Sequence, residues 1–267
     1  MPPAIHAIHH AQAQHNINND LNHPDPVLTE LGYQQCKTAA TELGGLGDKI
    51  DLILASPLQR TIQTALAVFP AYTKSKKQVV LLPDLQESSI APSDTGSCRE
   101  YLEMLYGPVL DYSFLTPDWT DKGPKSRHSP RFAEARARST RLFIRAIAQE
   151  YRDRDFNIVV VSHGMYLRYL TKHEGNMFRH VERRTYVFGP ITGSDSEANF
   201  LETPCSIARR ERWHAKPKDA SINSFGPQAP VPAGLQVEAP AAPSGCSDDD
   251  CGAYYPAFCP ETPEGGQ

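Results

Sequence analysis

Residues 157–164 of this chain read NIVVVSHG. The four β-branched residues Ile158–Val161 favour a strand that is buried on both faces, which is typical of parallel sheets covered by helices. Ser162, His163 and Gly164 follow at the point where such a strand ends. In open α/β sheets, ligands bind just beyond the carboxyl ends of the strands. The residues that directly follow each strand are therefore the candidates for a functional site.

Strand and helix patterns alternate along the rest of the chain. The other predicted strands are Ala4–Ile8, Ile50–Ala55 and Val79–Leu82. The predicted helices are Pro57–Phe69, with Pro57 at its first position, Phe132–Tyr151 and Met165–Thr171. This alternation predicts an α/β fold, a three-layer sandwich with a mostly parallel central sheet and helices on both faces.

The composition limits the kinds of partner. The 267 residues are 40% hydrophobic and 22% charged, as in ordinary globular proteins. The formal net charge of −4 gives no basic footprint, so we expect a small-molecule substrate and no nucleic acid. No apolar run approaches the roughly 20 residues that cross a bilayer, and the first residues do not resemble a signal peptide. We therefore expect no membrane association and a cytoplasmic location; the oligomeric state stays open.

The composition changes near His214. Residues 215–267 contain nine Pro, nine Ala and six Gly, but only six Leu, Ile, Val or Phe, which is too little apolar material for a core. The sequence therefore predicts a catalytic domain over residues 1–214, with an insertion at about 87–129, and a Pro/Ala-rich acidic tail over residues 215–267. Three of the six cysteines are in this tail. In a reducing compartment all six are expected to be thiols.

Polar side chains follow every predicted strand. They are His9, His10, Gln12, His15 and Asn16 after the first, Ser56 and Arg60 after the second, Glu87 after the third, and Ser162 and His163 after the fourth. Such a set suits attack on an anionic group. One imidazole serves as nucleophile, a guanidinium and a second imidazole bind oxygens, and a carboxylic acid protonates the leaving group.

The motifs around these residues resemble those of the histidine phosphatase superfamily, in its phosphoglycerate-mutase-like branch, and in particular fungal proteins of that type. The matching stretches are Ile8–Gln12, Leu28–Gly32, Ala55–Ala65, Leu85–Glu87, Asp94–Ser97 and Val161–Gly164. The resemblance covers most of residues 4–190. It implies a phosphoglycerate-mutase-like fold and hydrolysis of a small organic phosphate, with no cofactor and no metal.

The resemblance also assigns roles to single residues. It makes His10 the nucleophile that becomes a phosphohistidine, with Arg60 and His163 binding the transferring oxygens. Glu87 stands at the position of the proton donor, with Asp94 as a substitute. The residues expected to bind substrate are His9, Gln12, Asn16 and Ser162.

His9 departs from the family pattern, which has Arg in an Arg-His-Gly or Arg-His-Ala signature. Arg supplies a permanent charge and a bidentate fork, whereas His, with an ordinary pKa of about 6.5, supplies neither at neutral pH. The loss is expected to cost on the order of 2–4 kcal/mol of transition-state stabilisation. If protonated His9 replaces the guanidinium, activity rises as the pH falls from about 8 toward 6.

Two other functions therefore stay open. One is a repurposed lyase, cyclase or hydrolase in which His10, His163 and Glu87 transfer protons on a carboxylate or phenolic substrate. The other is a catalytically inactive binding protein.

The remaining charged and aromatic residues are expected to be structural or exposed. His6 is predicted to pack within its strand, in preference to a zinc site of His6, His9, His10 and His15. We expect solvent exposure of His128, His180 and the arginine face of the long helix, which comprises Arg136, Arg138, Arg141 and Arg145. The aromatic residues of the insertion are expected to line an apolar pocket; they are Tyr101, Tyr106, Tyr112, Phe114 and Trp119.

Overall fold

The computed structural model describes residues 2–189 and 197–215. Its elements in chain order are β1 (Ala4–His9), α1 (His15–Asn18), α2 (Glu30–Leu43), η1 (Gly44–Lys49), β2 (Leu52–Ala55), α3 (Gln59–Val68), α4 (Pro70–Lys74), β3 (Val79–Leu81), η2 (Pro83–Leu85), η3 (Pro92–Asp94), α5 (Arg99–Tyr106), η4 (Gly107–Val109), β4 (Leu110–Asp111), η5 (Pro130–Phe132), α6 (Ala133–Glu150), β5 (Asn157–Ser162), α7 (Gly164–Thr171), β6 (Arg183–Phe188), β7 (Phe200–Glu202) and α8 (Pro204–Ala215).

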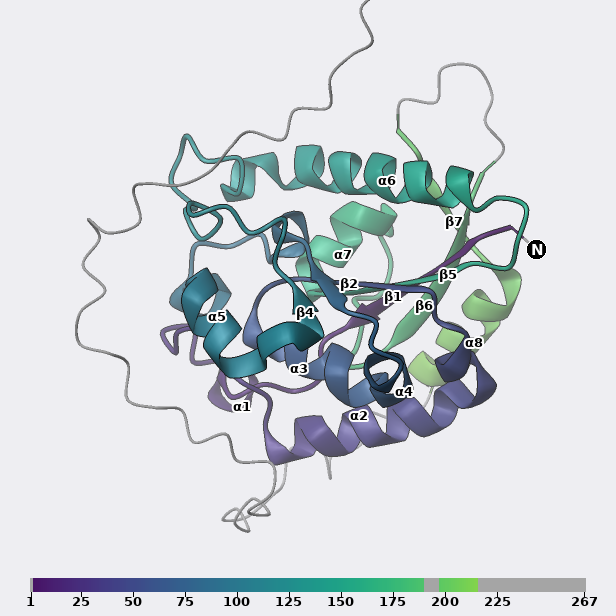
Figure 1. The fold of residues 1–267 in the computed structure, drawn as a ribbon, viewed down its shortest axis with the longest axis horizontal. Helices are drawn as coiled ribbons and strands as arrows, with labels where there is room; N and C mark the ends of the chain where they lie inside the picture. The colour runs from purple at the N-terminus through teal and green to yellow at the C-terminus, as the bar shows by residue number, and fades with distance from the viewer. Residues whose placement is uncertain (1, 190–196, 216–267) are drawn as a thin grey trace, which may run out of the picture.

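A seven-stranded sheet in the order β4-β3-β2-β5-β1-β6-β7 forms the middle layer (Figure 1). Strands β4, β3, β2, β5 and β1 are parallel to one another, whereas β6 is antiparallel to β1 and β7 is antiparallel to β6. Helices α6 and α7 cover one face, and α2 and α3 cover the other. The predicted three-layer α/β sandwich with a mostly parallel sheet is confirmed.

The continuous apolar run of β5 is explained by burial on both faces. Ile158 and Val160 pack in the cluster that contains α6 and α7, while Val159 and Val161 pack in the cluster that contains α2 and α3. All four side chains are fully buried. Burial of one such side chain contributes roughly 1.5–3 kcal/mol to folding. This central strand therefore joins the two halves of the core.

Helix α3 begins later than the sequence predicts. Its first residue is Gln59, and Leu58 before it has an extended backbone, with ψ at 140°. The prediction that Pro57 is the first helical residue is therefore wrong. The carboxylate of Asp25 instead accepts a hydrogen bond from the Gln59 N–H at 3.0 Å, so a distant loop satisfies one of the free donors at this helix start.

The predicted solvent-exposed arginine face of α6 is wrong for two of its four members. Arg136 and Arg141 are 2% and 0% exposed. Arg136 donates to the backbone carbonyls of Asp84 and Gln86 at 2.9 and 3.0 Å. Arg141 donates to the carbonyl of Tyr169 at 2.9 Å and also binds the segment at Glu197. These bonds connect α6 to the segment at Asp84–Gln86 and to the last turn of α7, whose carbonyls need partners.

Residues 87–129, the predicted insertion, add to the sheet and to the core. Their short strand β4 pairs with β3 at the edge of the sheet. Trp119 and Tyr112 are 1% and 9% exposed and belong to the core cluster, so the expectation that they line a pocket is wrong. Phe114 is 42% exposed and packs edge-to-face on Phe143. Tertiary packing uses most of this aromatic area for stability.

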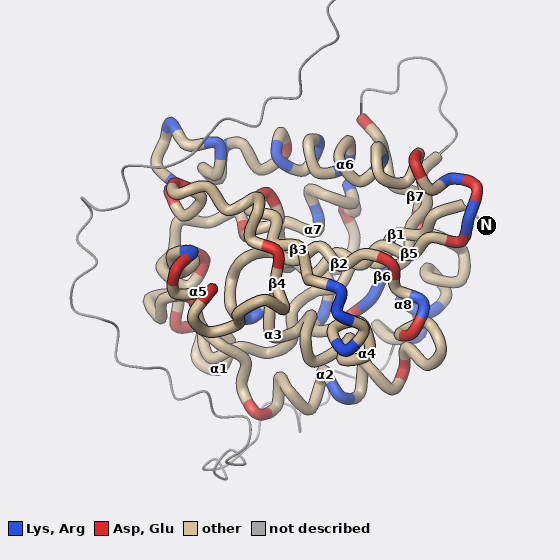
Figure 2. The backbone as a smooth tube through the Cα atoms, viewed as in Figure 1, with Lys and Arg blue, Asp and Glu red and all other residues tan. Residues whose placement is uncertain are grey.

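The described residues carry charges of both signs on their surface. Lys and Arg are interspersed with Asp and Glu over the outer helices and loops (Figure 2). Cys36 and Cys205 have no disulfide partner within the described ranges. No helix within residues 2–189 and 197–215 has the length and hydropathy needed to cross a bilayer. The predicted acidic tail and its three cysteines lie outside the described residues, apart from Ala215.

Candidate active site

His10 and His163 directly follow two neighbouring parallel strands, β1 and β5. The register pairs His9 with Ser162, so the two histidines leave the sheet at the same level. Their ring centroids are 5.2 Å apart, and the residues are 3% and 0% exposed. The structure therefore brings the two imidazoles together at the carboxyl edge of the sheet.

The hydrogen bonds of His10 define its tautomer. Its Nδ1 lies 2.7 Å from the carbonyl oxygen of Ala11, which can only accept, so Nδ1 carries the proton. The other nitrogen, Nε2, accepts from Nε of Arg60 at 3.2 Å. Burial, and then the neighbouring His9 ring and the Arg60 guanidinium, lower the pKa of His10 well below its usual 6.5. His10 is therefore neutral at neutral pH, with a lone pair on Nε2.

Arg60 connects the catalytic candidates. Besides His10, its guanidinium donates to the Ser93 carbonyl at 2.6 Å, to Oδ1 of Asp94 at 2.7 Å and to Nδ1 of His163 at 3.0 Å. Because Arg60 can only donate, Nδ1 of His163 accepts, and Nε2 of His163 carries a proton toward the Ser56 hydroxyl at 2.8 Å. Burial lowers the pKa of Arg60, and the Asp94 carboxylate opposes this change. The result is a buried cation that touches both imidazoles.

Glu87 lies against the first turn of α7. Its Oε1 accepts from the N–H groups of Ser88 and Tyr166 at 2.7 and 3.0 Å, and its Oε2 accepts from the N–H of Met165 at 3.1 Å. Burial raises the pKa of Glu87 above its usual value, while the bond from Ser88 lowers it. The carboxyl group therefore keeps a proton to higher pH than an exposed glutamate does, as a proton donor requires.

Lys122 stabilises the loop that carries Glu87 and Asp94, and the sequence analysis missed it. Its ammonium donates to the backbone carbonyls of Glu87 and Ser89 at 3.0 Å each and to that of Asp94. The residue is 8% exposed, and burial lowers its pKa to about 8. A single lysine in a polar insertion gives no sequence signal for such a position. Its partners come together only in the folded chain.

His9 and His180 complete a histidine cluster. Nδ1 of His9 donates to the Phe178 carbonyl at 3.0 Å, so Nε2 of His9 is an acceptor. The ring of His180 lies 5.3 Å from that of His9 and 5.8 Å from that of His10, measured between centroids. The prediction that His180 faces solvent is therefore wrong. The loop before β6 turns this residue into the site.

The electrostatics of His9 contradict the expected charge change between pH 8 and 6. Burial, and then the neighbouring His180, lower the pKa of His9 well below 6.5. Burial also lowers the pKa of His180 to about 4. Both rings are therefore less protonated near neutral pH than an exposed histidine. His9 does not reproduce the permanent charge of the family's arginine.

Other histidines have structural positions. His6 is 4% exposed and contacts Asn157 and Thr185 through its two ring nitrogens, which confirms the predicted packing within the strand. His128 is also 4% exposed, so its predicted exposure is wrong; its ring lies 3.9 Å from the Asp84 carboxylate. His15 is 7% exposed, and its ring centroid is 5.9 Å from that of His10.

Three residues predicted to bind substrate have protein partners. Oε1 of Gln12 accepts from the Thr29 hydroxyl at 2.8 Å. Oδ1 of Asn16 accepts from the Ala13 N–H at 3.0 Å. The Ser162 hydroxyl donates to the Leu85 carbonyl at 2.7 Å. These bonds give each side chain a positioning role, and its contact with substrate stays a prediction.

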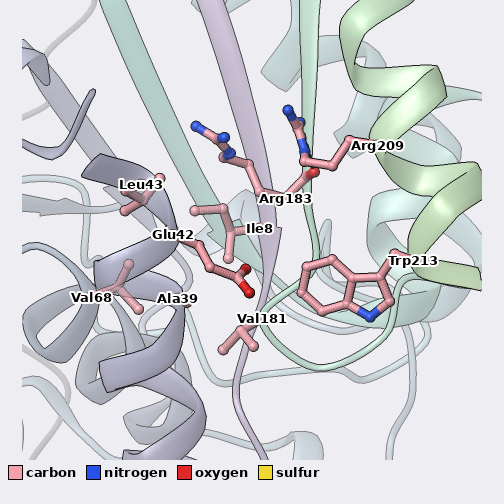
Figure 3. A pocket seen from close by; sticks show the side chains of 9 residues that line it. All are labelled: Ile8, Ala39, Glu42, Leu43, Val68, Val181, Arg183, Arg209 and Trp213. Carbon is pink, nitrogen blue, oxygen red and sulfur yellow. Dashed lines mark hydrogen bonds between the residues drawn. The ribbon is translucent and has the colours of Figure 1, made fainter. Parts of the chain in front are cut away.

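A hollow elsewhere on the protein, with a volume of about 40 Å³, contains none of these residues. Its lining is Ile8, Ala39, Glu42, Leu43, Val68, Val181, Arg183, Arg209 and Trp213 (Figure 3). Arg183 and Arg209 lie close together on one side of a mostly apolar surface. This lining contains none of the imidazoles that meet at the carboxyl edge of the sheet.

Comparison with known proteins agrees with this geometry. Residues 5–185 match the sequence model of the histidine phosphatase superfamily, branch 1. The chain belongs to this superfamily. The chain is 32% identical over 136 residues to phosphoglycerate mutase-like protein 2 of Arabidopsis thaliana, covering 42% of this chain and 39% of that protein. It is 29% identical over 117 residues to a "Probable phosphatase" of Schizosaccharomyces pombe, covering 43% of this chain and 54% of that protein. The chain thus spans only about half, or less, of these curated relatives.

A solved structure shows the same fold. The ecdysone phosphate phosphatase of Bombix mori, in complex with tungstate, matches with a TM-score of 0.52 and 14% sequence identity. The match covers 72% of this chain and 96% of that chain. The likeness supports the phosphoglycerate-mutase-like α/β architecture.

Proposed function

We propose that this histidine phosphatase hydrolyses a small organic phosphate through a phosphohistidine on His10. The observation that carries this proposal is the contact between Arg60 and the neutral Nε2 of His10. A nucleophile needs a free lone pair, and the bond from Nδ1 to the Ala11 carbonyl keeps that lone pair on Nε2. We expect Arg60 to contact the oxygens of a phosphoryl group attacked by His10, and His163 to hold the guanidinium through its Nδ1. The same contact from His163 would require its N–H to leave the Ser56 hydroxyl.

The first chemical step transfers the phosphoryl group to the protein. Nε2 of His10 forms a bond to phosphorus as the ester P–O bond breaks. The leaving oxygen takes the proton of the Glu87 carboxylic acid and departs as an alcohol. We favour Glu87 over Asp94 because burial raises the pKa of Glu87, whereas Asp94 forms an ion pair with Arg60 at 2.7 Å.

The second step restores the enzyme. The Glu87 carboxylate takes a proton from water, whose oxygen attacks phosphorus as the N–P bond breaks. Inorganic phosphate leaves, and His10 regains its lone pair. Every bond and proton is accounted for by these two residues and one water molecule, so the proposed reaction requires no cofactor.

His9 makes the phosphate site weaker than that of the family pattern. Its N–H is already donated to the Phe178 carbonyl, so the nitrogen that remains is a lone-pair acceptor. An acceptor does not bind phosphate oxygens, and Arg60 is left as the guanidinium in contact with His10. We therefore expect slow turnover of simple phosphate esters at neutral pH.

The test compares wild type, His10→Ala and His23→Ala. His23 is exposed, so His23→Ala is a control that also removes one histidine but lies outside the proposed site. Turnover of p-nitrophenyl phosphate and a panel of sugar and aryl phosphates is measured, and rapid quenching in alkaline denaturant traps phosphohistidine from labelled substrate. We expect label and turnover in wild type and His23→Ala and neither in His10→Ala. Wild-type turnover in His10→Ala would overturn the proposal.

A second candidate function is acid–base catalysis on a carboxylate or phenolic substrate. The specific observation in its favour is the neutral His9 ring, whose centroid lies 4.4 Å from that of His10. Two adjacent neutral imidazoles can accept protons, and an arginine at position 9 could not. A variant that has lost all phosphatase activity but still converts a substrate without a phosphate group would favour this candidate.

A further inference from the structure

Three histidines lie in the geometry of a metal site. His9, His10 and His180 each offer a ring nitrogen, and these three atoms lie within 4.8 Å of one another. Nitrogen ligands of a tetrahedral Zn²⁺ ion, at about 2.1 Å from the metal, are about 3.4 Å apart. Side-chain shifts of about 1 Å therefore bring all three nitrogens into the coordination sphere. Among the described residues, no other cluster of at least three His, Cys, Asp or Glu side chains reaches this spacing.

Two of these histidines already have the outer hydrogen bonds that are typical of metal ligands. Nδ1 of His9 donates to the Phe178 carbonyl at 3.0 Å, and Nδ1 of His10 donates to the Ala11 carbonyl at 2.7 Å. A ligating imidazole usually donates its other N–H to a backbone carbonyl or carboxylate, which sets its orientation. In both residues Nε2 is left as the donor atom for a metal.

The third histidine is available as well. No hydrogen bond joins the His180 ring to any of residues 2–189 and 197–215. Its ring is half-buried beside His9, so its nitrogens are available to a metal ion that is held by His9 and His10.

The positive charge of Arg60 opposes a bound cation. Its ion pair with Asp94, at 2.7 Å, offsets part of that charge. The bond from Arg60 to Nε2 of His10, at 3.2 Å, is also the longest of its four contacts. A metal that takes this lone pair removes only that contact, and the other three stay satisfied.

We propose that His9, His10 and His180 bind one Zn²⁺ ion, and that the bound ion prevents phosphoryl transfer to His10. Three imidazoles leave a fourth position for water or an anion. The claim that Zn²⁺ binds depends only on the three histidines. The claim that Zn²⁺ inhibits the reaction rests on the proposed phosphatase function. The proposal differs from the sequence-based expectation that no metal is bound. The reason is His9 itself, because an arginine at this position would supply no ligand.

The test begins with metal binding, which does not depend on any activity. Metal-free full-length protein is titrated with Zn²⁺ in competition with a chromogenic chelator, and with Co²⁺ while its visible absorption is followed. We expect one site per chain in wild type, with the intense absorption of tetrahedral Co²⁺. Loss of one ligand in His9→Arg or His180→Gln is expected to weaken binding by more than about 100-fold. His23→Gln serves as the matched control and should bind as wild type.

The inhibition is measured separately with p-nitrophenyl phosphate. Zn²⁺ is expected to stop wild-type turnover, and a chelator to restore it, whereas His180→Gln should need far more Zn²⁺ for the same effect. Equal Zn²⁺ affinity in wild type, His9→Arg and His180→Gln would overturn the site, because the ion would then lie elsewhere, for example on the cysteines beyond residue 215. Binding at the cluster with undiminished turnover would overturn the inhibition alone. If no variant hydrolyses phosphate, the titrations still decide the metal site.

Discussion

Nε of Arg60 lies 3.2 Å from Nε2 of His10, so a buried cation donates to the nitrogen whose lone pair the proposed reaction requires. This contact keeps His10 unprotonated on Nε2, because a protonated nitrogen beside the guanidinium would face a second positive charge. A phosphate oxygen that enters the site can replace this contact. In the proposed reaction, Arg60 would change from a hydrogen-bond donor to His10 into a ligand of the phosphate.

Arg60→Lys is expected to lower kcat/KM for p-nitrophenyl phosphate by about 100-fold or more. A lysine keeps the charge, but its single nitrogen cannot reach all four of the acceptors that the guanidinium now binds. Arg138→Lys, at a half-exposed position on α6, is the control and should keep wild-type kinetics. Circular dichroism of both variants checks folding. Unchanged kcat/KM in folded Arg60→Lys would exclude the proposed contact with phosphate.

His9→Arg is expected to raise phosphatase kcat/KM at pH 7 by about tenfold or more. The substitution adds a permanent charge and a bidentate fork where His9 offers only an acceptor. His23→Arg adds the same charge at an exposed position and should have no effect. A fall in phosphatase turnover would instead favour the acid–base function. The same variant separately tests the Zn²⁺ site by titration.

The free energy of unfolding is expected to fall as the pH drops from about 6.5 to about 4. Burial lowers the pKa of His6 and of His128 to about 4, whereas an unfolded chain has its histidine pKa near 6.5. Within this window the unfolded chain binds protons that the folded chain excludes. Each of these histidines therefore removes on the order of 1 kcal/mol of stability per pH unit, and the loss is absent above pH 7.

Urea unfolding of wild type at several pH values measures this dependence. His128→Asn should flatten the curve between pH 6 and 4.5, while the exposed control His23→Asn should reproduce the wild-type slope. If His128→Asn and wild type have the same slope, the lowered pKa of His128 is ruled out as a source of the pH dependence.

Gly96→Ala is expected to destabilise the fold by about 1–3 kcal/mol or more, because a Cβ at this position would lie 2.0 Å from a ring carbon of Trp119. Trp119 is 1% exposed and cannot move without disturbing the core. Gly47→Ala is the matched control, since a Cβ there meets no atom within 4 Å. Thermal unfolding of both variants measures the difference. Equal melting temperatures would contradict the close packing of Trp119 on Gly96.

Periodicity in the sequence determined the sheet and the edge where the site lies. The uninterrupted run Ile158–Val161 predicts a strand buried on both faces, and the structure confirms this. Because parallel strands end at one edge, the polar residues after them converge, and His10, Arg60 and His163 are in contact as expected. These predictions succeeded because they depend on local chemistry and on the direction of the strands.

Contacts between distant segments decided the rest. Helical periodicity places Arg136 and Arg141 on a polar face, but carbonyls of remote loops bury both guanidiniums. His180 looks like an exposed loop residue, yet the chain before β6 turns it against His9 and creates the three-histidine cluster. Sequence patterns specify which residues favour the core. They do not specify which backbone oxygens or lone pairs on distant segments will need a partner. Only the tertiary structure brings those groups within hydrogen-bonding distance.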